Sequence, residues 1–235
     1  MDMDQKAFIG RISQALGHDE VPEHITPSYD YSKGLQYSRL RDLDAAGLRA
    51  QLASQQKLRD FTMLECDKAE LGATIAGILE KEAPKCVVVP KDTASDGLDL
   101  VALAKGAVGT AEVFAYDKAG DAAAQRATIE QADVSITIPY RAVADTGHVL
   151  EIADARCGKV VSLLPPAHIA IVYQSRLRAT LTELAPELDA MSEAGMPPTY
   201  FLFVSGPSST GDIESVMVTG VHGPTREYTI VVKDM

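Results

Sequence analysis

The 235-residue sequence has few cysteines, no tryptophan and a deficit of basic residues. Its three cysteines, Cys66, Cys86 and Cys157, are far apart in the chain, which excludes a disulfide framework and a four-thiolate zinc or iron–sulfur site within this chain. Lys and Arg total 22 against 33 Asp and Glu, so the net charge is −11. Because nucleic acids are anionic, a non-specific nucleic-acid binder would carry the opposite sign, and we expect no nucleic-acid partner.

Long apolar runs and targeting signals are also missing. The longest apolar stretches, such as residues 86–90 and 201–204, are far shorter than the roughly 20 residues of a membrane span. The acidic Met-Asp-Met-Asp start lacks the basic segment and apolar core of a secretory signal. We therefore expect a cytoplasmic protein with reduced thiols and no membrane span.

Common motifs for nucleotide binding, hydrolysis and zinc binding are absent. The sequence has no Gly-x-Gly-x-x-Gly, no Walker A run and no Gly-x-Ser-x-Gly. Its five histidines do not pair at the spacing of His-Glu-x-x-His. The sequence therefore predicts no metal site in this chain.

What is present is the composition of a folded protein, with 46% hydrophobic and 23% charged residues. Residues 1–60 contribute only −1 to the net charge, and residues 61–235 contribute the other −10. Apolar residues at helical spacing, Phe8, Ile9 and Ile12 among them, predict a short helix that ends near Gly17. Prolines and tyrosines between residues 18 and 38 indicate an extended, irregular segment after this helix. We expect residues 1–60 to form an N-terminal helix and extended arm, and residues 61–235 to form an α/β domain.

From residue 84 onward, apolar runs rich in β-branched residues alternate with helical patterns. Strands are predicted at residues 86–89, 112–116, 134–138, 169–173, 200–204 and 228–232, and helices at 98–105, 118–131, 176–191 and 210–218. This alternation is typical of a mostly parallel, doubly wound sheet. Earlier leucine spacing predicts helices over 40–52 and 64–79, and two short β runs at 147–152 and 159–163 are expected to form a hairpin or a meander.

The densest polar motif follows the predicted strand 200–204 and opens the predicted helix at 210. In a parallel sheet this turn lies at the carboxyl ends of the strands, where ligands bind. Small and hydroxyl-bearing residues beside free helix N–H groups suit a phosphate or carboxylate, although the same residues form an ordinary helix cap. The candidate ligand-binding residues here are Ser205, Gly206, Ser208, Thr210, Asp212 and Glu214.

Three further turns carry candidate groups. His222 lies between Gly220 and Gly223 and is either a proton shuttle or a structural turn residue. His168 follows two prolines at the entry to a strand and either faces a cleft or is buried against backbone. The third turn contains Asp145, Thr146 and Gly147, preceded by Thr137. We assign His168, His222 and Asp145 as candidate catalytic residues, and Thr137, Thr146, Gly147 and Gly223 as candidate ligand-binding residues.

These segments, taken in order, resemble the lactate utilization protein C family of LUD-domain proteins. The resemblance rests on residues 8–12 and 15–17, on Ala-Asp-Thr-Gly at 144–147, on Ser-Leu-Leu-Pro at 162–165 with His-Ile-Ala-Ile at 168–171, and on the series Ser-Gly-Pro-Ser, Asp-Ile-Glu and Gly-Val-His-Gly-Pro between 205 and 224. It covers nearly the whole chain. His148 stands where the family usually has Thr, and Ser209 replaces a larger residue.

The resemblance implies a Rossmann-like layered sheet of the NagB/RpiA/CoA-transferase type. It also implies a role in oxidising L-lactate to pyruvate beside cysteine-rich partner subunits that carry iron–sulfur clusters, with no cofactor bound by this chain. Whether the chain is itself catalytic stays open. Two alternatives are a stand-alone enzyme acting on a phosphosugar, CoA ester or folate, and a non-catalytic adaptor that docks iron–sulfur subunits.

Overall fold

The computed structural model describes residues 5–18, 34, 37–93, 96–152, 158–195, 200–211 and 217–234. The chain divides into two units, residues 1–35 and 36–235. The first contains helix α1 (Gln5–Ala15), which the apolar spacing predicted. The division predicted at residue 60 falls just after α2 (Ala45–Lys57), a helix that lies within the second unit.

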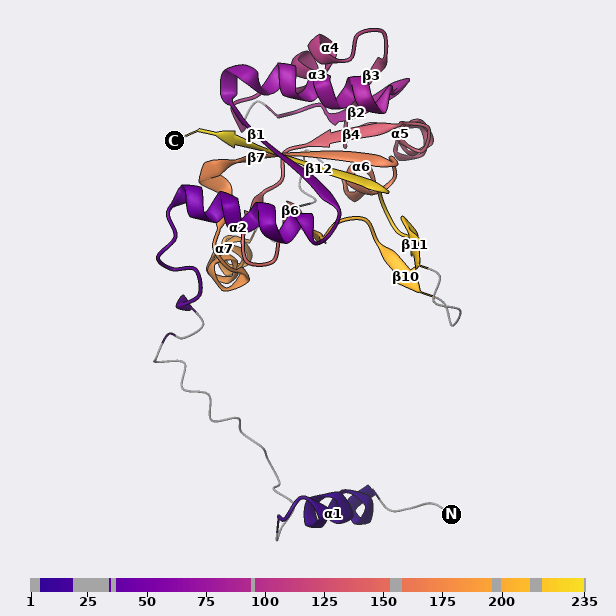
Figure 1. Cartoon of the computed structure of the whole chain (residues 1–235). Coiled ribbons are helices and arrows are strands. Elements are labelled where there is room, and N and C mark those ends of the chain that lie inside the picture. The colour runs from indigo at the N-terminus through magenta and orange to yellow at the C-terminus, as the bar shows by residue number, and fades with distance from the viewer. Residues whose placement is uncertain are drawn as a thin grey trace. The chain divides into compact units, whose positions relative to one another are not determined.

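A six-stranded parallel sheet forms the centre of the second unit (Figure 1). Apolar, β-branched runs form its inner strands because both faces of the sheet are covered. This sheet confirms the predicted mainly parallel α/β class. In spatial order the strands are β1 (Phe61–Asp67), β12 (Arg226–Lys233), β7 (Ala167–Tyr173), β4 (Val134–Thr137), β2 (Cys86–Pro90) and β3 (Glu112–Tyr116).

Different layers cover the two faces of this sheet. Helices α3 (Leu71–Glu82) and α4 (Leu100–Ala107) pack on one face against side chains such as Ile169 and Ile230. The opposite face meets α2, α5 (Ala122–Ile129), α6 (Lys159–Leu163) and a second sheet. Because side chains alternate along a strand, residues of even number in β7 face this second layer.

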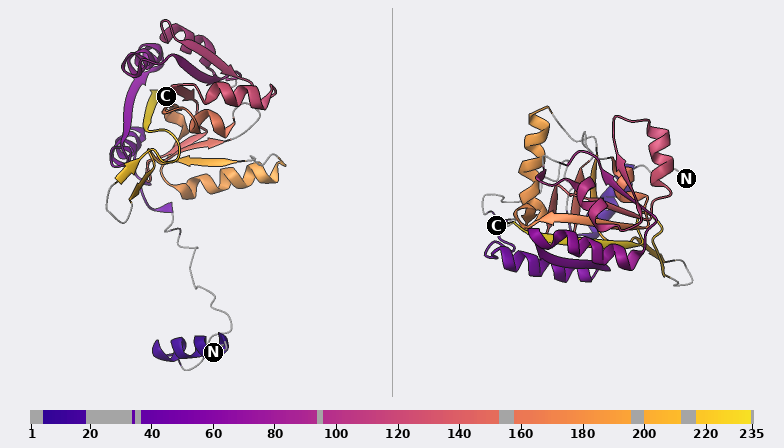
Figure 2. Two further views of the ribbon diagram at one scale, coloured as in Figure 1. Left: turned by 90° about the vertical axis from the view of Figure 1, so that its right-hand side faces the viewer. Right: turned by 90° about the horizontal axis from the view of Figure 1, so that it is seen from above.

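The second sheet has four strands in the order β8 (Leu177–Arg178), β5 (Arg141–Val143), β6 (Val149–Ile152) and β9 (Phe201–Val204). Strand β6 runs antiparallel to both β5 and β9. Helix α7 (Leu181–Glu193) packs on the face of this sheet that points away from the six-stranded sheet (Figure 2). Two 3₁₀ turns, Lys68–Glu70 and Gln174–Arg176, and a hairpin of β10 (Ser209–Gly211) and β11 (Met217–Thr219) complete the described elements.

Several local predictions were wrong. Residues 64–67, predicted as the start of a helix, belong to β1, because residues 61–67 pair along their whole length with β12. Residues 159–163 are the helix α6, whose Val161 packs on Val88 and Ile129, so the expected hairpin with 147–152 does not form. The helix predicted from residue 176 begins at Leu181, after a 3₁₀ turn and β8.

The largest departure from prediction concerns the segment after residue 200. Strand β9 belongs to the antiparallel second sheet, and the next described elements are the strands β10 and β11 instead of a helix over 210–218. β-Branched residues in both of these strands, such as Thr210 and Val218, favour strand over helix.

Within the described ranges, no helix is both long and apolar enough to cross a lipid bilayer.

Candidate functional site

A row of buried polar side chains crosses the face of the main sheet that meets the second sheet. Ser135 and Thr137 come from β4, His168 comes from β7, and Glu227 and Thr229 come from β12, and none is more than 2% exposed. All five lie on the face opposite α3 and α4, because their strand neighbours of the other parity fill the apolar core beneath those helices. Such a row is unusual in a buried parallel sheet, and it marks the candidate site.

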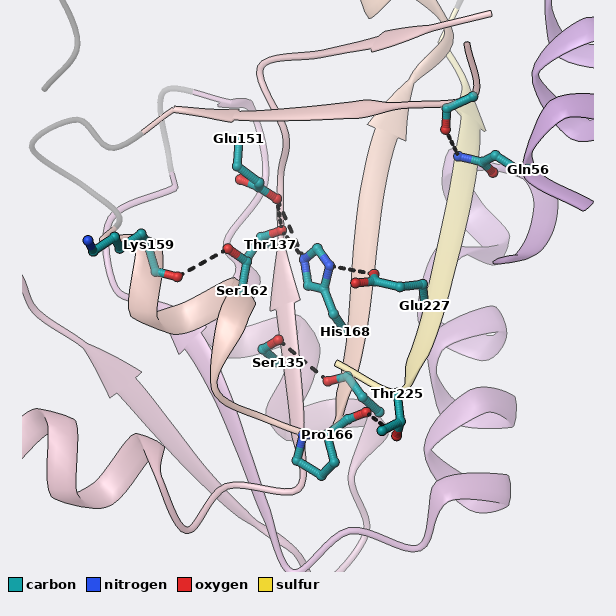
Figure 3. Close-up of polar contacts among 12 residues, drawn as sticks. Gln56, Ser135, Thr137, Glu151, Lys159, Ser162, Pro166, His168, Thr225 and Glu227 are labelled. Atoms are coloured by element: carbon teal, nitrogen blue, oxygen red, sulfur yellow. Dashed lines mark hydrogen bonds and ion pairs between the residues drawn. The ribbon is translucent and has the colours of Figure 1, made fainter. Parts of the chain in front are cut away.

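His168 lies at the centre of this row (Figure 3). Its Nδ1 is 2.8 Å from Oε2 of Glu227, and its Nε2 is 2.8 Å from Oγ1 of Thr137. The Thr137 hydroxyl also makes a hydrogen bond to Oε1 of Glu151, which comes from β6 of the second sheet. The distance from Nε2 of His168 to that same Oε1 is 3.6 Å. One imidazole ring therefore lies between two carboxylates that belong to different sheets.

The two carboxylates decide the charge of the ring. Burial by itself lowers the pKa of His168, but the Glu227 carboxylate, the hydrogen bonds of both glutamates and the charge of Glu151 raise that pKa to about 10. Burial raises the pKa of Glu227 more than the neighbouring imidazolium lowers it. Because the pKa of His168 lies well above 7, its ring is an imidazolium at neutral pH.

An imidazolium fixes the directions of the hydrogen bonds. Because both ring nitrogens carry protons, Nδ1 donates to Glu227 and Nε2 donates to Oγ1 of Thr137. The Thr137 hydroxyl then donates to Oε1 of Glu151. Glu151 is the outermost member of this chain, since its side chain is 10% exposed while those of His168 and Glu227 are 0% and 1% exposed. Both of its contacts among the described residues use the same oxygen, Oε1.

The structure brings His168 and Thr137 together, as members of one hydrogen-bonded group. Glu151 and Glu227 complete this group, and neither was predicted from the sequence. The signal for Glu151 is a lone acid inside an apolar strand, Val-Leu-Glu-Ile, and Glu227 lies at the start of a strand, directly before the run Tyr-Thr-Ile-Val-Val. Buried acids of this kind are seldom tolerated without a partner.

The turn that contains Asp145, Thr146 and Gly147 lies against the C-terminal end of α2. Gly147 has φ +74°, and a Cβ there would lie 3.0 Å from Cβ of Gln55. The buried Gln56 side chain donates from Nε2 to the Gly147 carbonyl oxygen at 3.1 Å. Asp145 forms an ion pair with Arg39 at 2.7 Å. The glycine at this turn therefore permits close packing of a helix.

The Ser-Gly-Pro-Ser segment lies beside that turn, because Val204 of β9 pairs with Val149 of β6. Gly206 has φ +101°, and a Cβ there would lie 2.3 Å from the Arg59 carbonyl oxygen. Gly206 therefore allows the chain to approach the backbone of Arg59 closely, rather than a ligand. Ser205 is exposed. Thr210 lies in β10, and Asp212 and Glu214 lie outside the described residues.

Ser208 connects this segment to the histidine turn. Its carbonyl oxygen accepts a hydrogen bond from the Gly220 N–H at 2.6 Å, and its hydroxyl oxygen accepts one from the His222 N–H at 2.8 Å. His222 itself is exposed, and a Cβ added at Gly223 would lie 3.7 Å from Cδ2 of Leu163. The Ser208 hydroxyl oxygen therefore stabilises the histidine turn by accepting a hydrogen bond from its backbone.

These motifs lie near one another. The prediction that the Ser-Gly-Pro-Ser segment lies at the carboxyl end of a parallel strand was wrong, because this segment follows β9 of the second sheet. The turn 220–224 comes just before β12, and His168 is the second residue of β7, at the entry to a strand as predicted. Since no helix begins at Thr210, the expected anion site at a helix N-terminus is also wrong. In the described part of the chain, no three potential metal ligands gather in one place.

Comparisons with known proteins assign the chain to a family. The family model of the LUD domain matches residues 50–232. The chain belongs to the LUD domain family. It is 32% identical over 232 residues to the lactate utilization protein C of Macrococcus caseolyticus, with 97% of this chain and 95% of that protein covered. It is 28% identical to the protein of the same name from Bacillus subtilis, with 98% and 96% covered.

Among solved structures, this LUD-domain chain is similar to a DUF162 family protein from Deinococcus radiodurans. The TM-score is 0.57 at 23% identity, and the match covers 81% of this chain and 99% of that one. This likeness concerns the fold. The family assignment confirms the resemblance drawn from the motifs between residues 144 and 224.

The raised pKa of His168 predicts how stability depends on pH. A histidine whose folded pKa lies above its ordinary value of 6.5 stabilises the fold fully below pH 6.5 and loses that contribution as the pH rises towards about 10. The raised pKa of Glu227 acts in the same direction. We expect the free energy of unfolding, measured by urea titration, to fall over this interval. His168→Gln is the control, and an equally steep fall in that variant would contradict the assignment.

The contact of Gly206 predicts a graded effect of alanine substitutions. Gly206→Ala places a Cβ against the Arg59 carbonyl at a positive φ, whereas Gly195→Ala meets no atom within 4 Å at φ +70°. The control should lose only about 1–2 kcal/mol, the cost of the left-handed conformation. Gly206→Ala should lose clearly more in the same urea titration. Equal losses would show that the Arg59 contact is unimportant.

Proposed function

We propose that this LUD-domain protein is a component of a lactate-utilization system that oxidises L-lactate to pyruvate together with iron–sulfur partner subunits. Its relatives over nearly their full length carry the name lactate utilization protein C. The observation that supports a functional site is the chain of hydrogen bonds from Glu227 through His168 and Thr137 to Glu151. Buried, perturbed ionisable groups of this kind gather at functional sites.

The reaction removes two electrons and two protons from L-lactate, and one of the protons comes from the 2-hydroxyl group. A carboxylate is a suitable acceptor for that proton. Glu151 has this role in our proposal, because it is the outermost group of the chain and its contacts among the described residues use one oxygen only. The proton from C2 is released to solvent, and the two electrons pass one at a time to the oxidised iron–sulfur clusters of the partner subunits.

The other members of the chain act as positioning residues. The His168 imidazolium and the Thr137 hydroxyl hold Oε1 of Glu151 in place and keep a positive charge near its carboxylate. Glu227 in turn orients the ring through Nδ1 at 2.8 Å. This order of acid, imidazole, hydroxyl and acid keeps the outer carboxylate in one orientation, which efficient proton transfer requires.

The decisive variant is Glu151→Gln, which keeps the side-chain shape and removes the proton acceptor. In a host strain that lacks the gene, the variant should lower L-lactate-dependent pyruvate formation by about 100-fold or more relative to the restored wild type, in line with the usual weight of a general base. Pyruvate formed per unit of protein in cell lysates measures the effect. Glu80→Gln, an exposed glutamate on α3, is the matched control and should retain full activity.

Two negative results have separate meanings. If deletion of the gene leaves growth on L-lactate unchanged, the proposed function is wrong. If deletion abolishes growth but Glu151→Gln supports it at the wild-type rate, the function stands and the role given to Glu151 is wrong.

A further inference from the structure

Helix α6 carries a buried serine beside the candidate site. The helix packs on β4, the strand that contributes Thr137. Ser162 of α6 is only 2% exposed. Figure 3 shows Ser162 next to Thr137 and below Glu151, on the side of the His168 ring that faces away from Glu227. A hydroxyl group therefore lies in the same layer as the outermost acid of the hydrogen-bonded chain.

This hydroxyl group is poorly satisfied by the protein itself. It donates to the Lys159 carbonyl oxygen at 3.4 Å, well beyond the roughly 2.7–2.8 Å that is typical of O–H···O hydrogen bonds. Ser54 of α2 makes the same kind of bond to the Gln51 carbonyl oxygen at 2.8 Å. Among the residues that the structure describes, the Ser162 hydroxyl has no other hydrogen bond. Burying a hydroxyl without a good partner is costly, so packing alone does not explain a serine within the apolar run Val-Val-Ser-Leu-Leu.

The neighbouring acid also has an oxygen to spare. Both contacts of Glu151 in the described ranges use Oε1, which leaves Oε2 for a ligand. The His168 imidazolium lies 3.6 Å from Oε1 and offsets the negative charge of Glu151, so an anion can approach this carboxylate. In a 2-hydroxycarboxylate, the hydroxyl and carboxylate groups are on adjacent carbon atoms. A residue that binds the carboxylate must therefore lie close to the residue that accepts the hydroxyl proton.

We infer that Ser162 binds the carboxylate of a 2-hydroxycarboxylate substrate, while Glu151 accepts the proton of its 2-hydroxyl group. The inference rests on the proposed function and deepens it, because it names the group that distinguishes such a substrate from a simple alcohol. Ser162 exchanges its long bond to a backbone carbonyl for a charge-assisted hydrogen bond, which is the stronger of the two.

The test measures KM and kcat for L-lactate in lysates of the deletion strain that carries each variant, with a soluble dye as electron acceptor. Ser162→Ala should raise KM by about tenfold or more, the effect of losing a hydrogen bond to a charged group. Its kcat should stay near that of the wild type, because the carboxylate is bound equally in the ground state and the transition state. Ser54→Ala is the matched control, since this exposed serine makes the same type of backbone bond, and should change neither constant.

Propionate provides a second measurement, because it retains the carboxylate of L-lactate and lacks the 2-hydroxyl group. Its inhibition constant against L-lactate should rise in Ser162→Ala by about the same factor as KM. If KM rises while inhibition by propionate is unchanged, Ser162 does not bind the carboxylate and the inference is overturned.

The remaining outcomes separate the inference from the function on which it rests. If Ser162→Ala keeps the wild-type KM, or if its kcat falls together with its unfolding temperature, Ser162 is structural and the inference is wrong. If the restored wild type forms no more pyruvate from L-lactate than the deletion strain, the proposed function itself fails, and the role of Ser162 fails with it.

Discussion

The interaction on which this structure depends is the buried pairing of the His168 imidazolium with the carboxylates of Glu227 and Glu151. It joins three strands of the parallel sheet, β4, β7 and β12, to β6 of the second sheet. Removing charges from water is costly, and the pairing offsets this cost only while every member is present. Loss of one member leaves the others buried without a partner, a change that typically costs about 3–5 kcal/mol.

The second sheet supplies the outermost acid of this pairing and separates the pairing from the surface. Its inner face supplies Glu151 and the apolar residues that exclude water from the ring, and its outer face is covered by α7 up to the edge strand β9. The same β6–β9 pair therefore holds the outermost acid of the site and exposes two phenylalanines at the surface. The turns that hold Gly147 and Gly206 fix the end of this pair against α2 and the residues that follow it, because neither position has room for a side chain.

Prediction from the sequence succeeded where the pattern was local. The apolar runs of β2, β3, β4, β7 and β12 identified the parallel sheet, and their regular spacing identified its class. His168 was recognised as a candidate because it follows two prolines at the entry to a strand, and Thr137 because it precedes the Asp-Thr-Gly turn. Prediction failed for β9–β11, since a polar turn after an apolar strand looks the same whether the next element is a helix or a hairpin, and only the pairing of β9 with β6 distinguishes them.

The sequence by itself therefore determined the α/β class, the family and the residues from which the turns are built, because periodicity and turn chemistry act over a few neighbouring positions. Only the tertiary structure decided which of those residues form a site. Glu151 and Glu227 are 76 positions apart, and nothing local indicates that both face one histidine ring. Strand pairing and the packing of one sheet on another bring them together. Because the interface between the sheets has low polarity, the two carboxylates raise the pKa of His168 more strongly than they would in water.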